Sequence, residues 1–483
     1  MKIAEPDAYI DSLRGLERRV FLLGKPVENT VDHPMVRPSA NAVAETYNVG
    51  DEPGAEELLF ATSHLTGEKV SRFTHIHQDT DDLVRKVLMQ RLLGRRTSTC
   101  YQRCVGMDGF NALYSVTYEC DKDHGTSYHE RLKDYLKWVQ EENVVVDGAM
   151  TDVKGDRSLR PGDQVDPDMF VHIVDRSAEG IVVRGAKAHQ TGALNSHEIL
   201  VMPTAAMRES EADFSVAFAI PVTTKGLTFV LGRQPSDTRK MEDSPLDVGN
   251  PMYGSQEALV IFDDVFVPTE RVFMAGEYDM SGKVVERFAA YHRQSYGGCK
   301  VGVGDVLIGA AQLAARYQGV ARASHVRDKI TEMIHLNETL FCCGIACSAR
   351  GEATASGAYM VDVLLANICK QNVTRFPFEI SRLLQDIAGG LVVTMPSEKD
   401  FENPETAPYL EKYLKGSANV PTMDRIKISK FIENMTMGCG AAAYLTESIH
   451  GAGSPQAQRI VISRLADIEE KVKLAKRLAR IED

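Results

Sequence analysis

The change in hydrophobic periodicity along the chain limits its fold more than any other feature of the sequence. Up to about residue 145, apolar residues recur at helical spacing, as in 83–93 and 131–140. The pattern then turns into short β-branched and aromatic runs separated by Gly, Pro, Asn and Asp, namely 169–174, 181–183, 214–220, 227–230 and 258–262. From residue 276 long helical patterns return, for example at 305–315, 327–349 and 460–480.

This order predicts an α+β protein built from three regions. They are an N-terminal α-helical domain (1–145), a central antiparallel β domain (146–275) and a C-terminal α-helical domain (276–483). Asp79 or Thr80 should cap the helix over 83–93, because acids precede it and bases follow, as the helix dipole favours. The Pro- and Glu-bearing stretch 396–408 is expected to be an exposed loop.

Size and charge narrow the functional classes. A chain of 483 residues that is 43% hydrophobic has ample material for a large core. Its net charge of -12 and pI of about 5.6 argue against nucleic acid or an anionic membrane as the main partner. We find no signal peptide and no uncharged apolar stretch of about 18 residues. A cytoplasmic protein without a membrane span is expected, with its nine cysteines as reduced thiols or metal ligands.

Two cysteine pairs suggest a metal site. Cys100 and Cys104 form a C-x₃-C pair, which would share one face of a helix. Far downstream, His292 and Cys299 are seven residues apart and would again share a helical face. Gly297 and Gly298 remove side-chain bulk next to the Cys299 thiol, which would let a bulky inorganic group approach. Three thiolates and one imidazole suit iron–sulfur chemistry, although a C-x₃-C pair alone is more often two core thiols.

Other cysteines and histidines compete for such a role. Cys342, Cys343 and Cys347 lie in a helical stretch rich in Leu, Ile and Ala, which favours buried core thiols. Several histidines lie among polar residues and are expected to be solvated: His33, His75, His77 and His325. Spacing alone does not choose between the two cysteine groups.

Two polar stretches in the central region are candidate ligand sites. Residues 185–192 are expected to link two strands, so that His189, Gln190 and Thr191 could bind the edge of a flat ring; the stretch could equally be a surface turn. Residues 148–157 could meet a phosphate or ribose through four side chains: Thr151, Asp152, Lys154 and Arg157. The glycines between 302 and 309 lie inside an apolar helix, which argues against a Rossmann site.

Two carboxylates are candidate bases. Glu257 enters the strand at 258–262, and Glu447 precedes a Gly-rich turn. Each could be a buried base with a raised pKa or an ordinary surface residue.

Several stretches resemble a known family. Residues 262–268 resemble the segment that closes the β domain of acyl-CoA dehydrogenases, whose α–β–α order also fits. More specifically, the chain resembles the 4-hydroxybutyryl-CoA dehydratases over nearly its full length, in residues 89–94, 102–108, 183–192, 291–305, 335–340 and 451–459. The stretch at about 399–425 departs from that family and is expected to be shorter or divergent.

The resemblance implies a homotetramer with an acyl-CoA dehydrogenase-like fold, FAD and an oxygen-sensitive [4Fe-4S] cluster. It implies reversible radical dehydration of 4-hydroxybutyryl-CoA to crotonyl-CoA and isomerisation of vinylacetyl-CoA to crotonyl-CoA. It selects Cys100, Cys104, His292 and Cys299 as cluster ligands over the Cys342 group. A radical route is needed because the thioester activates only C2, whereas the proton to be lost lies on C3.

The resemblance also implies roles for single residues. His292 would yield its iron to the substrate hydroxyl and move a proton, with Glu447 assisting proton transfer at C2. Tyr296 and Glu257 would orient the hydroxyl. Thr191 would form a hydrogen bond with the flavin ring. Further flavin contacts would come from the following residues: Thr151, Asp152, Lys154, Arg157, His189, Gln190, Gly389 and Gly390.

Two other functions stay open at this point. One is a cluster-free, flavin-dependent aromatic hydroxylase of the 4-hydroxyphenylacetate 3-hydroxylase type, which would share the fold. The other is a non-catalytic iron–sulfur or electron-carrier subunit, which would leave the two carboxylates and Tyr296 without a purpose. The iron and flavin contents of the anaerobically purified protein distinguish the dehydratase, the hydroxylase and the electron-carrier subunit.

Overall fold

The N-terminal part of the chain is mainly helical. The structure is a computed structural model that describes residues 1–481. Its first helices are α1 (Pro6–Arg14), α2 (Arg37–Ala44), α3 (Ala55–Leu59), α4 (Thr80–Thr97), α5 (Cys104–His124) and α6 (Tyr128–Glu142). Short strands lie between them: β1 (Val20–Leu22), β2 (Lys25–Pro26), β3 (Phe60–Thr62) and β4 (Lys69–Ser71). The Asp79 side chain accepts a hydrogen bond of 2.8 Å from the Asp82 backbone N–H, which confirms the predicted cap of α4.

The central part contributes most of two sheets. Its strands are β5 (Val146–Ala149), β6 (His172–Arg176), β7 (Gly180–Thr191), β8 (Glu198–Val201), β9 (Val216–Pro221), β10 (Leu227–Leu231), β11 (Glu257–Pro268) and β12 (Val272–Ala275), with the short helix α7 (Pro245–Val248). Six strands are ordered β2-β1-β10-β11-β7-β6, and four are ordered β12-β9-β8-β5.

The expectation of a purely antiparallel central domain is wrong in two places. β5 pairs with β8 in parallel, and β1 pairs with β10 in parallel. In addition, β1 and β2 come from the N-terminal part, so the larger sheet draws strands from two regions of the sequence. Local alternation identifies a strand but carries no information on its partner, which explains the error.

The segment 185–192 is not a loop. It lies largely inside β7, which runs antiparallel to β11 with Thr191 opposite Glu257 and Gly185 opposite Phe262. Gly185 has a φ of +135°, and a Cβ there would lie 2.6 Å from the Phe170 carbonyl oxygen. Glycine is therefore required at position 185 inside this strand, where it permits close packing.

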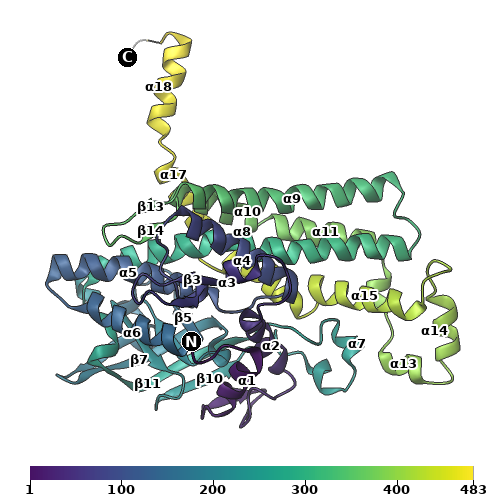
Figure 1. The fold of residues 1–483 in the computed structure, drawn as a ribbon, viewed down its shortest axis with the longest axis horizontal. Coiled ribbons are helices and arrows are strands. Elements are labelled where there is room, and N and C mark those ends of the chain that lie inside the picture. The colour runs from purple at the N-terminus through teal and green to yellow at the C-terminus, as the bar shows by residue number, and fades with distance from the viewer. Residues whose placement is uncertain (482–483) are drawn as a thin grey trace.

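The C-terminal part is a helical bundle above the sheets (Figure 1). Its longer helices are α8 (Tyr278–Tyr317), α9 (Ser324–Ala349), α10 (Val363–Val373), α11 (Phe376–Ala388), α15 (Thr422–Thr436), α17 (Pro455–Leu465) and α18 (Ile468–Ala479). Shorter elements are β13 (Glu352–Ala353), β14 (Tyr359–Met360), α12 (Leu391–Thr394), α13 (Glu398–Glu402), α14 (Ala407–Tyr413) and α16 (Glu447–His450). The expectation that residues 396–408 form a loop is wrong, because α13 and the start of α14 lie within this stretch.

α8 is the central helix of the bundle, and its glycines bring neighbouring helices close. A Cβ on Gly298 would lie 2.5 Å from the Val87 carbonyl oxygen of α4, and one on Gly297 would lie 2.6 Å from Gly344 of α9. These glycines therefore serve helix packing. The prediction that they make room for an inorganic group is wrong. By length and composition α8 is the one helix of residues 1–481 that could cross a membrane, but 61% of that stretch is buried inside the protein.

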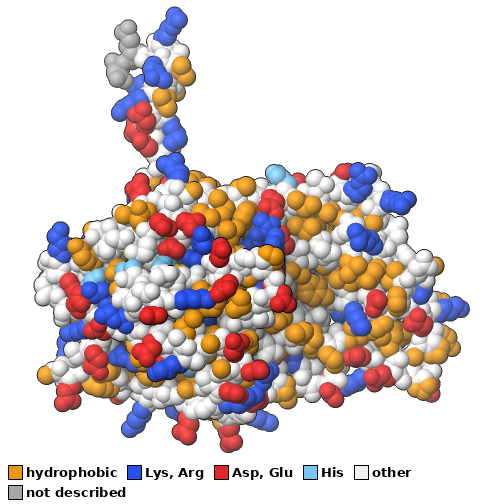
Figure 2. Space-filling model, in the orientation of Figure 1, with side chains coloured by type: hydrophobic (Ala, Val, Ile, Leu, Met, Phe, Trp, Pro, Cys, Tyr) orange, Lys and Arg blue, Asp and Glu red, His pale blue; other side chains and the backbone are white. Residues whose placement is uncertain are grey.

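The last helix stands apart from the body. α18 projects away from the bundle beyond α17 (Figure 1), and Figure 2 shows hydrophobic side chains along it. Ile468, Val472 and Leu478 are 53%, 41% and 80% exposed. An amphipathic helix with its apolar residues in solvent lacks the tertiary packing that normally stabilises a helix of this length.

Candidate functional site

Three thiols and an imidazole gather where α4, α5 and α8 meet. Cys104 is the first residue of α5, and His292 and Cys299 lie on α8 as predicted. Cys100 lies in the connection between α4 and α5, so the expected helical face shared with Cys104 is wrong. Burial raises the pKa of the Cys104 thiol, and Cys100, Asp108 and Cys299 raise it further, which means that these groups lie close enough to interact.

The donor set fits a cluster better than a single ion. Within residues 1–481 no three His, Cys, Asp or Glu side chains converge on one metal position. A four-iron cluster requires no such convergence, because each protein ligand binds a different iron. One buried thiol, Cys104, two partly buried thiols, Cys100 and Cys299, and the imidazole of His292 are the kinds of donor that such a cluster takes.

A buried charge network orients His292. The Nδ1 atom of His292 lies 2.8 Å from Oδ2 of Asp108, and the Nζ atom of Lys86 donates to Oδ1 of Asp108 over 2.5 Å. Lys86 and Asp108 are 0% exposed, and Ser295 also donates to the carboxylate. Burial opposes ionisation of Asp108, but Lys86 and His292 outweigh it and hold its pKa below the usual range. The network leaves Nε2 of His292 available for a metal.

The sequence had assigned no role to Asp108 or Lys86. The signal was present in the helical pattern, because Lys86 falls on the buried face of α4 with Leu83, Gln90 and Leu93. A lysine on an otherwise uncharged buried face requires a buried anion as partner.

Tyr296 and Glu447 border the same space. The Tyr296 hydroxyl lies 3.4 Å from Nε2 of His292, and a Cβ on Gly451 would lie 2.0 Å from that hydroxyl oxygen. Lys300 donates to Oε2 of Glu447 over 2.9 Å and to the Ala443 carbonyl oxygen. Glu447 follows a π-helical turn, Ala442–Thr446, a local distortion that is frequent at functional sites.

Glu257 and Thr191 meet across the sheet. The Thr191 hydroxyl lies 2.8 Å from both carboxylate oxygens of Glu257. Burial raises the pKa of Glu257 well above its ordinary value, and nearby Glu447 raises it further. The structure therefore brings together all four residues that the sequence suggested for catalysis, which are His292, Glu447, Tyr296 and Glu257.

The residues expected to contact the flavin have different surroundings. Lys154 and Arg157 lie near His189: burial lowers the pKa of His189, and Lys154, His450 and Arg157 lower it further. Asp152 is instead committed to an internal ion pair, with Lys187 2.9 Å away and both side chains buried.

Three further expected contacts have other surroundings. The side-chain amide of Gln190 donates to the backbone carbonyls of Ala188 and Thr151, so it supports the strand. Gly389 ends α11 with a φ of +76°, and a Cβ on Gly389 or Gly390 would meet open space.

Two expectations about other residues are wrong. His75 and His77 are buried, and Nε2 of His75 lies 2.7 Å from Oδ2 of Asp82, so they are not solvated. In the second cysteine group Cys347 is buried but Cys342 is exposed, so this group is not a set of core thiols.

The chain matches known proteins over nearly its full length. Models of the 4-hydroxyphenylacetate 3-hydroxylase family match residues 5–274 with the N-terminal region and residues 281–480 with the C-terminal region. The oxygenase component of 4-hydroxyphenylacetate 3-monooxygenase from Thermus thermophilus is 28% identical, with 91% of this chain and 90% of that protein covered. A structure of such a component complexed with FAD has a TM-score of 0.85 at 24% identity, covers 98% of both chains and shares the fold.

Two relatives are much more similar. The 4-hydroxybutyryl-CoA dehydratase/vinylacetyl-CoA-Δ-isomerase of Clostridium aminobutyricum is 56% identical over 98% of this chain and 99% of its own length. The structure of an oxygen-tolerant archaeal 4-hydroxybutyryl-CoA dehydratase from N. maritimus has a TM-score of 0.97 at 55% identity and covers 100% of this chain and 96% of that one. The family resemblance seen in the sequence is confirmed: this chain belongs to the 4-hydroxybutyryl-CoA dehydratase family.

Proposed function

We propose that this protein is a lyase and isomerase. It dehydrates 4-hydroxybutyryl-CoA reversibly to crotonyl-CoA and isomerises vinylacetyl-CoA to crotonyl-CoA. The observation that carries the proposal is the identity of 56% over nearly the whole of both chains with an enzyme named for both activities. The aromatic hydroxylases are far more distant, at 28% identity or less among the relatives compared above.

We propose a [4Fe-4S] cluster on Cys100, Cys104, His292 and Cys299, and FAD near Thr191 and Glu257. The cluster proposal rests on the three neighbouring thiols and on the imidazole that the Asp108 carboxylate orients. The flavin proposal rests on the cationic group around His189, which suits a pyrophosphate. When bound, the cluster supplies a Lewis acid for the substrate hydroxyl and the flavin supplies a one-electron store.

The side chains of this chain perform the proton transfers. Glu447 accepts the C2 proton, and Lys300 at 2.9 Å stabilises its carboxylate. Glu257 has a raised pKa, so it stays protonated at a higher pH than a surface glutamate and can donate a hydrogen bond. Two carboxylates in different surroundings thus serve as proton acceptor and hydrogen-bond donor.

At the hydroxyl end of the substrate, His292 and Tyr296 act together. Asp108 binds Nδ1 of His292, so Nε2 is the atom that exchanges a proton with the leaving hydroxyl. The Tyr296 hydroxyl, 3.4 Å from that nitrogen, orients the oxygen. Tyr296 is 1% exposed, which keeps bulk water from the reacting atoms.

We also propose a cytoplasmic homotetramer. The apolar residues that α18 exposes away from the body support an association with another copy. Deleting residues 467–483 should then lower the molecular mass measured by light scattering on the anaerobic holoenzyme. An unchanged tetramer would remove α18 from the interface.

The proposed function is tested on protein purified without oxygen. Iron, sulfide and flavin are measured together with crotonyl-CoA formation from both substrates. Replacing Cys100, Cys104 or Cys299 by Ala should lower the iron content and abolish dehydration. Cys342→Ala is the matched control, because this thiol is exposed, and it should keep both. Loss of iron from the Cys342 variant alone would overturn the ligand assignment, and a parent protein inactive on both thioesters would overturn the function.

A further inference from the structure

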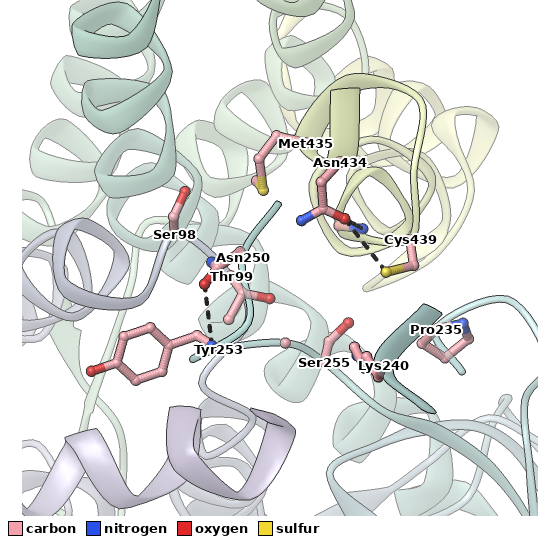
Figure 3. A pocket seen from close by; sticks show the side chains of 12 residues that line it. Ser98, Thr99, Pro235, Lys240, Asn250, Tyr253, Ser255, Asn434, Met435 and Cys439 are labelled. Atoms are coloured by element: carbon pink, nitrogen blue, oxygen red, sulfur yellow. Dashed lines mark hydrogen bonds between the residues drawn. The ribbon is translucent and has the colours of Figure 1, made fainter. Parts of the chain in front are cut away.

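The connection between α15 and α17 carries Glu447 but has little regular structure of its own. It contains the π-helical turn Ala442–Thr446 and the four-residue helix α16. At its start, the thiol of Cys439 lies 3.4 Å from Oδ1 of Asn434 (Figure 3), and the backbone N–H of Gly440 donates to the same oxygen over 3.1 Å. Such short turns satisfy few of their own backbone groups, so side chains of other helices must fix the position of Glu447.

Lys370 of α10 makes such a contact at α16. Its Nζ atom donates to the Ser448 carbonyl oxygen over 2.7 Å and to the Glu447 carbonyl oxygen over 3.4 Å. The same atom lies 3.9 Å from the centre of the Tyr296 ring. An ammonium has three N–H donors and no acceptor, which matches two carbonyl oxygens and one aromatic face. A neutral amine would direct its lone pair at one of these electron-rich groups, so the surroundings of Lys370 favour the charged form.

The position of Lys370 is unfavourable for a cation. Lys370 is 0% exposed, and within residues 1–481 no carboxylate forms an ion pair with it. Burial lowers the pKa of Lys370 well below its ordinary value and Lys300 lowers it further, whereas Glu447 opposes the shift. The other buried lysines of this part of the chain each pair with an Asp or Glu: Lys86, Lys187, Lys300 and Lys430. A buried cation without a counterion destabilises a fold, and such groups are enriched at functional sites.

The same face of α10 supports the segment at a second point. Asn367 lies one helical turn before Lys370, and its Oδ1 atom accepts a hydrogen bond of 2.6 Å from Arg293. Arg293 in turn donates through Nε to the Ala452 carbonyl oxygen over 3.0 Å. The α10 face therefore holds the chain both at α16 and at the turn that follows it.

We propose that Lys370 is a positioning residue for the reaction. Its ammonium fixes the backbone that carries Glu447 against the ring of Tyr296, so that the group that accepts the C2 proton and the hydroxyl that orients the leaving oxygen keep a constant separation. The inference rests on the proposed function and adds to it a residue that touches neither the reacting atoms nor a proposed cofactor ligand. A misplacement of about 1 Å can slow an enzyme about 100-fold, so this support matters for the rate.

The test is Lys370→Met in the holoenzyme purified without oxygen. The kcat values for dehydration and for vinylacetyl-CoA isomerisation should both fall about 10- to 100-fold, because both need proton transfer at C2. KM should change little, since no contact with the substrate is removed. Iron and flavin should be retained. The melting temperature should stay the same or rise, because the substitution removes a buried cation that has no counterion.

Two further variants separate positioning from a purely structural role. Lys430→Met removes another buried lysine, which lies 2.8 Å from Asp247 outside the reacting site, and should lower the melting temperature while kcat is kept. Lys370→Gln keeps an N–H donor without the charge and should give an intermediate kcat. If Lys370→Met does not fold, Lys370→Gln decides by the same measurements.

Two results would overturn the proposal. One is a parental kcat for both reactions in Lys370→Met. The other is a loss of kcat accompanied by a fall in melting temperature as large as that of Lys430→Met, which would give Lys370 a structural role alone. A parent protein inactive on both thioesters would instead refute the proposed function.

Discussion

Asp108→Asn is the most informative single perturbation of this protein. Asp108 is 0% exposed and accepts hydrogen bonds from Lys86, His292 and Ser295. The substitution keeps the shape of the side chain but removes its charge. The Lys86 ammonium is then left buried without a counterion, although the Tyr291 carbonyl and Gln294 side chain still accept from it at 3.0 Å.

The expected magnitude follows from this geometry. Removing one partner of a buried ion pair destabilises a protein by about 3–5 kcal/mol, and the two remaining acceptors favour the lower end, about 3 kcal/mol. Because the entropy of unfolding grows with chain length, this corresponds to a fall in melting temperature of only about 3 °C for 483 residues. An asparagine can also present its N–H₂ to Nδ1 and reverse the His292 tautomer, so dehydration should fall about 10- to 100-fold.

The assay combines anaerobic thermal unfolding of the holoenzyme, iron content, dehydration rate and a spectrum of the iron that reports on its histidine ligand. Asp279→Asn is the matched control, because Asp279 lies 3.1 Å from Nε2 of His124 at the surface and should contribute less than about 1 kcal/mol. Combining Asp108→Asn with Lys86→Met should recover part of the lost stability, since no buried charge remains unpaired.

One result would refute this reasoning. An Asp108→Asn enzyme with parental melting temperature, iron spectrum and dehydration rate would show that the network neither stabilises the fold nor orients His292. Lost stability with an unchanged spectrum and rate would leave Asp108 with a structural role alone.

Four further substitutions each test a single group. Thr191→Val should slow turnover and alter the flavin potential with iron retained; an unchanged potential and rate would exclude Thr191 from the flavin site. Glu447→Gln should keep iron and flavin but lose both activities, whereas His292→Cys should keep iron and lose dehydration; parental rates would contradict either role. Burial raises the pKa of Asp147 to about 7, above its unfolded value of about 3.9, so the folded state retains a proton and stability falls as pH rises from about 4 through 7. In Asp147→Asn, the denaturant midpoint of unfolding should fall less between pH 5 and 8 than in the parent protein. An unchanged dependence of the midpoint on pH would contradict the raised pKa of Asp147.

Much of the fold could be predicted because the spacing of hydrophobic residues along the chain indicates which face of a helix or strand is buried. The cap at Asp79 and the single long helix that carries His292 and Cys299 follow from local patterns. Local patterns failed where partners are distant in sequence. β1 joins β10, more than 200 residues downstream, and no residue within β1 encodes that pairing.

The sequence by itself determined the order of the elements and, through the family, the chemistry, and it singled out the thiols and the imidazole that we propose as donors. Only the tertiary structure decided which groups meet. Asp108 reaches His292 across a sequence separation of 184 residues, and Glu257 meets Thr191 across 66. The physical reason is that such contacts depend on how closely packed elements approach, which glycines such as Gly298 permit. A periodic pattern specifies that a face is buried, but the partner it meets is set by the packing of the whole chain.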